Sequence, residues 1–134
     1  MILVDTSVWV DYFNGHASKE AERLHRAIAD NEAICLPDIV CMEILLGIKT
    51  ESQAGRIAGL LEAFENVAEP THEDYLDAAR LYRRCRAKSY TIRSTIDCII
   101  AQICLRDGVE LLSKDRDFQK IAQCAPLRLT ELVA

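Results

Sequence analysis

The feature that most restricts the fold is the opening run Ile2-Leu3-Val4, which is aliphatic at every position and stops at the acid Asp5. A strand that is apolar on both faces is typical of a parallel sheet that is covered on both sides. The run predicts a first strand over residues 1–4. Shorter apolar runs predict further strands over residues 33–36, 66–68, 109–112 and 127–129.

Longer segments with helical spacing separate these runs. The clearest covers residues 71–88, where Thr71 can cap the helix, Glu73 and Asp74 lie in the first turn and basic residues crowd the last. Further helices are predicted over residues 18–30, 38–48, 52–64, 94–105 and 115–122. Because parallel neighbours need a crossover, which is normally a helix, the alternation predicts one α/β domain over residues 1–134 with helices on both sheet faces.

The composition agrees with one globular domain, since the chain has 134 residues, of which half are hydrophobic and 28% charged. Its apolar runs are far shorter than the roughly 18 residues that cross a bilayer, and no signal peptide is visible, so a cytoplasmic location is expected. The six cysteines lie in apolar surroundings and lack zinc-ligand spacing. We interpret them as small buried hydrophobic residues.

The balance of charge limits how the chain can bind nucleic acid. There are 21 acidic and 16 basic residues, which give a net charge of −5. This balance argues against tight binding to nucleic acid through bulk electrostatics alone. A substrate that carries phosphate would therefore need a bound cation or a local basic patch.

Acidic residues follow two of the predicted strands. Asp5 comes directly after the first strand, and Asp115 and Asp117 lie in the loop after residues 109–112. In open α/β sheets, ligands bind outside the carboxyl ends of the strands. The sequence therefore predicts that two strands deliver carboxylates to the same edge of the sheet.

Two more acids lie where a helix is otherwise apolar. Glu43 shares the apolar stripe of residues 39–46, and Asp97 is one of only two polar side chains between Ile96 and Leu105. A lone buried carboxylate costs several kcal/mol, so each needs a partner or a cation. Four acids from four segments favour a divalent metal, and hard oxygen ligands suit Mg²⁺ or Mn²⁺.

Each of these acids also has an ordinary structural explanation. Asp115 can be the N-cap of the last helix, and Asp97 is the third residue after a Ser94 cap, as in a capping box. Asp5 can simply begin a turn, and Glu43 can pair with a distant Arg. We interpret the remaining candidates as solvated or capping acids, namely Asp11, Asp30, Asp38, Glu20 and Glu22.

The acids recur inside three longer motifs, which are Ile2-Leu3-Val4-Asp5-Thr6-Ser7-Val8-Trp9, Thr95-Ile96-Asp97-Cys98-Ile99-Ile100-Ala101 and Leu112-Ser113-Lys114-Asp115-Arg116-Asp117-Phe118. Together and in this order they resemble the PIN-domain family, and within it the VapC-type toxin ribonucleases. The resemblance covers essentially the whole chain. Cys98 stands where Ala is common in the family, and Ser113-Lys114 stands where Thr, His or Asn often occurs, but neither difference removes a carboxylate.

The resemblance implies a three-layer sandwich around a five-stranded parallel sheet. It also implies a Mg²⁺-dependent endoribonuclease, with Mn²⁺ as a possible substitute, which acts as the toxin of a type II toxin–antitoxin system. RNA would be the substrate, an antitoxin protein the partner, and a homodimer the common assembly. The acidic quartet carried over from the family is Asp5, Glu43, Asp97 and Asp115, of which Asp5, Asp97 and Asp115 would hold the metal.

The resemblance further implies that Asp117 would be an outer acid, and that Thr6 and Ser113 would be hydroxyls that orient carboxylates or water. The expected phosphate contacts are Arg83, Arg84, Arg86, Lys88 and Arg93, although basic residues there can equally serve the helix dipole. Two other classes remain open. One is a non-catalytic protein-interaction module with a structural metal. The other is a metal-dependent phosphatase, although the haloacid-dehalogenase type would need a second Asp where this chain has Ser7.

Overall fold

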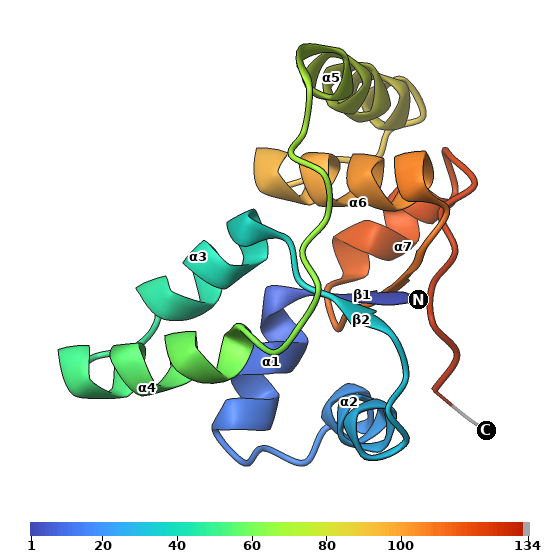
Figure 1. The fold of residues 1–134 in the computed structure, drawn as a ribbon. Coiled ribbons are helices and arrows are strands. Elements are labelled where there is room, and N and C mark those ends of the chain that lie inside the picture. The colour runs from blue at the N-terminus through green and yellow to red at the C-terminus, as the bar shows by residue number, and fades with distance from the viewer. Residues whose placement is uncertain (133–134) are drawn as a thin grey trace.

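A computed structural model describes residues 1–132 of the chain (Figure 1). Ten elements follow one another along it: β1 (Ile2–Val4), α1 (Thr6–Phe13), α2 (Lys19–Ala29), β2 (Ile34–Cys35), α3 (Asp38–Leu46), α4 (Glu51–Leu61), α5 (His72–Ala87), α6 (Thr95–Asp107), β3 (Glu110–Leu112) and α7 (Arg116–Ala122). Six of the seven helices agree with the sequence-based prediction to within a few residues at each end.

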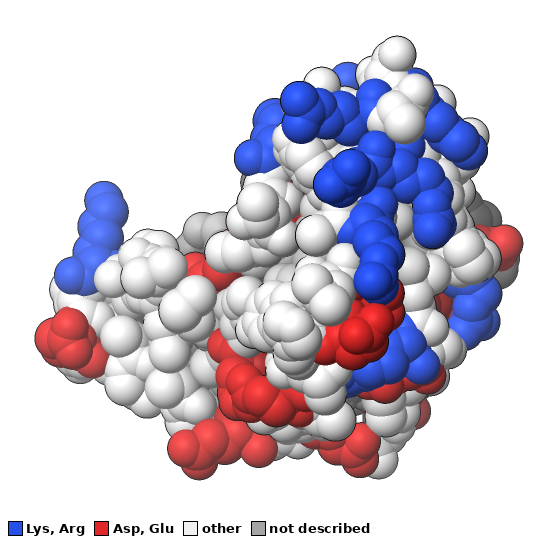
Figure 2. All heavy atoms as spheres, turned by 90° about the horizontal axis from the view of Figure 1, so that it is seen from above, with Lys and Arg blue, Asp and Glu red and all other residues white. Residues whose placement is uncertain are grey.

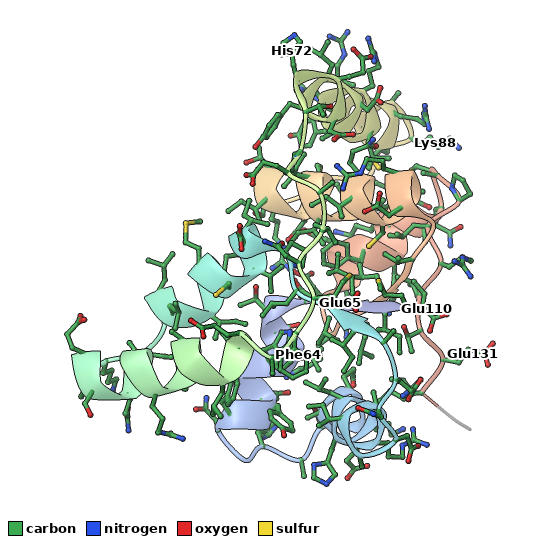
Figure 3. All side chains as sticks on the ribbon, viewed as in Figure 1. Phe64, Glu65, His72, Lys88, Glu110 and Glu131 are labelled. Carbon is green, nitrogen blue, oxygen red and sulfur yellow. The ribbon has the colours of Figure 1, made fainter. Side chains whose placement is uncertain are left out.

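The sheet has three parallel strands in the order β2-β1-β3. The expectation of five strands is therefore wrong for residues 1–132. Single parallel bridges, Cys35 to Glu65 and Leu111 to Leu129, extend the order at both edges without forming strands, and Glu65 is labelled beside β2 in Figure 3. Next to Glu65, the Val67 N–H donates to the Asn66 side chain, so this backbone group is taken by a side chain instead of a strand partner.

Helices cover both faces of this sheet, as expected for an α/β sandwich. In Figure 1, α6 and α7 lie on one side of the strands with α5 outside α6, whereas α1 and α2 lie on the other side. The core between these layers includes Leu3 and Val4 of β1, Trp9 of α1, Ile100 of α6 and Phe118 of α7, each at most 1% exposed. The helices α3 and α4 form a hairpin that projects from the body.

Helix α1 was not predicted. Its sequence, Thr-Ser-Val-Trp-Val-Asp-Tyr-Phe, is rich in β-branched and aromatic residues, which favour strands when considered alone. Tertiary packing overrides this preference, because one helical face buries Val8, Trp9 and Asp11. The helix begins immediately after Asp5, whose backbone C=O accepts from the Val8 and Trp9 N–H groups.

The six cysteines are all free, five of them buried and Cys41 half-buried, which confirms their interpretation as hydrophobic residues. No helix within residues 1–132 is long and apolar enough to cross a membrane.

Candidate metal centre

The parallel sheet brings the predicted acids to one edge. Asp5 follows β1, and its backbone N–H donates to the C=O of Leu112 at the end of β3, 2.9 Å away. Asp115 and Asp117 follow three and five residues after Leu112, and Asp97 lies in the first turn of α6. Asp97, Asp115 and Asp117 each place one oxygen within 4.8 Å of the other two. Three of the predicted acids thus form one cluster, which we call the three-acid cluster.

Asp5 is held in a fixed orientation beside this cluster. The hydroxyls of Ser7 and Ser113 both donate to its Oδ2 at 2.9 Å. Burial raises the pKa of Asp5, although these hydrogen bonds lower it in part. The Ser113 hydroxyl also accepts from the Asp115 N–H at 3.0 Å, so this one side chain links Asp5 to the loop of Asp115. Ser113 therefore contacts two of the acids, and Ser7, which was not singled out, shares the contact with Asp5.

Glu43 comes to the site from α3. The Thr6 hydroxyl donates to Glu43 Oε1 at 2.9 Å, so Thr6 orients this carboxylate across 37 positions of sequence. Burial raises the pKa of Glu43, and the negative charge of Asp5 adds to the increase. Within residues 1–132 no Lys or Arg pairs with Glu43, so the alternative of a salt bridge to a distant Arg is not realised.

Asp97 is the acid with the least compensation. Its side chain makes no hydrogen bond or ion pair with the described part of the chain, although the residue is only 9% exposed. The Ser94 hydroxyl accepts from the Ile96 N–H, so Ser94 caps α6 without a capping box to Asp97. Burial first, and then the charges of Asp5, Asp115, Asp117 and Glu43, raise the pKa of Asp97 to about 7. A buried carboxylate in this state fits a bound cation, and an all-oxygen donor set suits a hard divalent ion.

Asp115 and Asp117 also have structural roles, as a helix cap and as an ion-pair partner. Asp115 is the N-cap of α7, because its Oδ1 accepts from the Asp117 N–H at 2.9 Å. Asp117 is 1% exposed, and its carboxylate pairs with Arg93 and Lys120. Burial raises the pKa of Asp117, but the hydrogen bonds from Arg93 and Lys120 outweigh it and leave the pKa lowered. The structural explanation of Asp115 is thus realised together with its position in the cluster.

The predicted phosphate contacts fall into two groups. Arg93 lies at the three-acid cluster, where its guanidinium reaches both Asp115 and Asp117. The other four lie at the C-terminal end of α5, where Figure 3 labels Lys88, and we call them the α5 patch: Arg83, Arg84, Arg86 and Lys88. Figure 2 shows Lys and Arg side chains gathered over this part of the molecule, with acidic side chains beside them. All four are exposed.

The interpretation of Asp11 as a solvated or capping acid is wrong. Asp11 is only 9% exposed and pairs with Lys114 Nζ at 2.6 Å, while the Lys114 N–H donates to the Ser7 hydroxyl at 3.4 Å. Lys114 therefore ties the loop of Ser113 and Asp115 to α1. The signal for Asp11 is the one that marked Glu43 and Asp97, a single acid within an apolar run.

A comparison with protein families matches this chain to the model of the PIN domain over residues 2–123. Among curated proteins it is similar to VapC ribonuclease Mb1587 of Mycobacterium bovis, with 33% identity over 129 residues that cover 96% of each chain. It is also similar to ribonuclease VapC32 of Mycobacterium tuberculosis, with 30% identity over 125 residues, 93% of this chain and 91% of the other.

Solved structures show the same fold at lower identity. VapBC2 from Rickettsia felis, bound to a DNA fragment from their promoter, matches with a TM-score of 0.75 and 20% identity over 97% of this chain and 98% of the other. VapC20 of Mycobacterium tuberculosis, a toxin that cleaves the sarcin-ricin loop, matches with a TM-score of 0.67 and 18% identity over 96% and 99%.

Proposed function

The chain belongs to the PIN domain family, and from this premise we propose that it is a metal-dependent endoribonuclease, the toxin of a type II toxin–antitoxin system. Relatives at 33% identity over 96% of the chain are named ribonucleases, which supports RNA cleavage. The observation that carries the proposal is Asp97. A buried carboxylate without a partner, among four further acids, is costly unless a cation binds there.

Asp5, Asp97 and Asp115 would hold the ion, with Asp117 as the outer acid of the site. We propose Mg²⁺, with Mn²⁺ as a substitute, because both prefer carboxylate oxygens in a compact octahedral shell. When bound, such an ion polarises the scissile phosphate, lowers the pKa of a water molecule and offsets the charge that develops on the leaving oxygen.

The protein's own groups orient the acids and handle the proton. Ser7 and Ser113 donate to Oδ2 of Asp5 and so fix the orientation of this carboxylate. Thr6 occupies Oε1 of Glu43, so Oε2 is the oxygen that would accept a proton from the attacking water. A carboxylate whose pKa is raised by burial is a better base than an exposed one, and burial raises the pKa of Glu43.

The partners follow from charge and from the relatives. We propose that the α5 patch and Arg93 bind RNA phosphates, because these exposed cations lie on a chain whose net charge is −5. The similar structures include toxin–antitoxin complexes, so we propose a cognate antitoxin protein that covers the acidic site, and a homodimer as the assembly. Both would form in the cytoplasm.

The test is RNA cleavage by the purified protein with and without EDTA. We expect cleavage that EDTA abolishes, that Mg²⁺ or Mn²⁺ restores, and that Ca²⁺ supports poorly, since its larger, looser coordination misplaces the attacking water. Asp5→Asn should be inactive, whereas Asp77→Asn, a half-buried acid on α5 that pairs with Arg80 outside the site, should keep full activity. Cleavage that survives thorough chelation, or an active Asp5→Asn variant, would contradict the proposal.

The alternatives give other outcomes in the same assay. A structural-metal module would bind the ion without cutting RNA, and a phosphatase would release phosphate from monoesters and leave the chain whole. The toxin role has its own test, which is expression of the wild type alone. We expect growth arrest that the product of an adjacent gene relieves and that Asp5→Asn does not cause.

A further inference from the structure

Arg93 reaches from outside into the three-acid cluster. Its Nη2 lies 3.1 Å from Asp115 Oδ1, and its Nε lies 3.3 Å from Asp117 Oδ2. Its backbone N–H also donates to Asp117 Oδ2 at 2.9 Å. Arg93 is thus anchored at Asp117 by its main chain, while its side chain, 73% exposed, bridges two of the three carboxylates.

The carboxylate oxygens that Arg93 contacts have few lone pairs left to accept further bonds. Asp115 Oδ1 already accepts from the Asp117 N–H at 2.9 Å, so with Arg93 Nη2 both of its lone pairs are used. At Asp117, Oδ2 accepts twice from Arg93 and Oδ1 pairs with Lys120 Nζ at 3.2 Å. A divalent ion that binds these carboxylates therefore meets a guanidinium that already neutralises them.

We propose that Arg93 is an internal counter-cation that competes with the divalent ion for Asp115 and is released by it toward RNA. The proposal rests on the proposed function. Ion and guanidinium repel each other at the separation that one shared carboxylate imposes. When the ion holds the carboxylate, the side chain loses Asp115, but its backbone stays fixed at Asp117. The freed guanidinium then lies at the mouth of the site, where a phosphate of the RNA can replace the lost carboxylate.

The proposal predicts that ion binding and phosphate binding help each other. Without the ion, Arg93 is occupied by Asp115 and is less available to RNA. With the ion, the Nη2 end of the same side chain is free, so each ligand makes the other bind more tightly by the same factor. This coupling depends on Arg93 and not on the net charge of the site.

The first experiment measures Mn²⁺ binding by calorimetry without RNA, so it does not depend on activity. Arg93→Gln should bind Mn²⁺ roughly two- to fivefold more tightly than wild type, the range expected when a partly exposed ion pair is removed. Arg116→Gln is the matched control. Arg116 is exposed and lies between the two acids in sequence, but makes no ion pair with either of them within residues 1–132. It should change the affinity less than about twofold.

The second experiment measures RNA cleavage at saturating Mg²⁺. Arg93→Gln should lower kcat/KM even though it binds the ion more tightly, and Arg93→Lys, which keeps the charge but loses the planar bridge, should fall between wild type and Arg93→Gln in both assays. Circular dichroism and melting of each variant confirm that the fold is intact.

The outcomes separate this inference from the function it rests on. If wild type binds no Mn²⁺ or cuts no RNA, the proposed function fails. If wild type does both and Arg93→Gln binds Mn²⁺ no more tightly than Arg116→Gln does, Arg93 is not a competitor for the site and this inference alone is overturned. An Arg93→Gln variant with tighter ion binding and undiminished kcat/KM would contradict the release toward RNA.

Discussion

The first turns of α5 and α6 hold equivalent acids with opposite properties. Asp74 is the third residue after the Thr71 cap of α5, and Asp97 is the third residue after the Ser94 cap of α6. Both are more than 90% buried. A hydrogen bond from the Thr71 N–H, together with those from the Arg106 and Gln102 side chains, lowers the pKa of Asp74 to about 2, whereas burial and neighbouring acids raise that of Asp97 to about 7.

The difference lies in the surroundings and not in the helix position. Asp74 closes a capping box with Thr71 and pairs with Arg106 Nη1 at 2.7 Å, so its charge is fully compensated. Asp97 has the same favourable helix dipole, yet within residues 1–132 four carboxylates and no cation face it. A buried acid with hydrogen-bond donors and a cation around it therefore stabilises the fold, whereas a buried acid without them is available to bind a ligand.

The largest effect should come from removing the uncompensated acid. Asp97→Asn keeps the side-chain size and removes a proposed metal ligand, so RNA cleavage should fall by roughly 100-fold or more. Melting of the metal-free variant should be at least as high as that of metal-free wild type, because like-charge repulsion is relieved. Steady-state cleavage and thermal melts measure the two effects.

Asp107→Asn, at the other end of α6, serves as the control and should keep near wild-type turnover. Turnover by Asp97→Asn as high as that of Asp107→Asn would show that Asp97 does not belong to the site. A marked drop in its metal-free melting temperature, without any Mg²⁺ effect on wild type, would make Asp97 a structural cap.

The compensated acid should behave in the reverse way. Asp74→Asn loses the charge that faces Arg106, whose side chain is only 21% exposed, and weakens the capping box. We expect the melting temperature to fall by about 5 °C or more, while cleavage per folded molecule stays unchanged. Asp77→Asn on the same helix removes only a solvent-accessible ion pair with Arg80, so it should shift melting very little. If Asp74→Asn folds fully but loses RNA cleavage, Asp74 acts on the site and the contrast with Asp97 does not hold.

The two acids should also respond to pH in opposite directions. The folded-state pKa of Asp97 is raised from 3.8 to about 7, so between these values the folded state holds more protons than the unfolded state, and stability falls as pH rises. The folded-state pKa of Asp74 is lowered to about 2, so its stabilisation is present above pH 4 and is lost as pH falls toward 2.

Melting of metal-free wild type and Asp97→Asn from pH 5 to pH 8 measures this. The advantage of the variant should grow by roughly 5 °C up to about pH 7 and then level off, and Mg²⁺ should abolish it, because the ion stabilises only the wild type strongly. A difference that does not depend on pH would mean that Asp97 is not the titrating group.

Much of the candidate site could be predicted from the sequence, because three of its acids stand alone in apolar surroundings or at strand ends. Asp5, Glu43 and Asp97 were found in this way, and the parallel sheet explains why their segments meet. The same reasoning could not separate Asp97 from Asp74. Both follow a capping residue by three positions, and the partner that compensates Asp74, Arg106, lies 32 residues away.

The rest of the fold depended on contacts that local patterns do not encode. Helix α1 has the composition of a strand and becomes helical because Val8 and Trp9 are buried against the core. The outer strands were expected from short apolar runs, but each meets the sheet at one bridge only, at Glu65 and at Leu129. Propensity over three residues is too weak to decide such cases.

The smallest effects are expected at Asp11, because the compensation of its charge is intermediate between that of Asp74 and that of Asp97. It is as buried as Asp97 but has one cation, Lys114, whose side chain is 35% exposed. Burial raises the pKa of Asp11, yet hydrogen bonds from Lys114 and Ser18 outweigh it and leave the pKa lowered. If partners decide the character of a buried acid, Asp11 should stabilise the fold modestly and also position the loop of Ser113 and Asp115.

A double-mutant cycle of Asp11→Asn and Lys114→Gln measures the first effect, and we expect a coupling free energy of about 0.5–1 kcal/mol in unfolding. RNA cleavage by either variant should fall by roughly two- to tenfold, since Lys114 ties the loop of Asp115 to α1, and the double variant should lose no more than the singles. Coupling in stability without any change in cleavage would make the pair purely structural, in the same class as Asp74 and Arg106. An effect on cleavage that adds in the double variant would instead mean that Asp11 and Lys114 act on the site separately, so that burial and not pairing governs what Asp11 does.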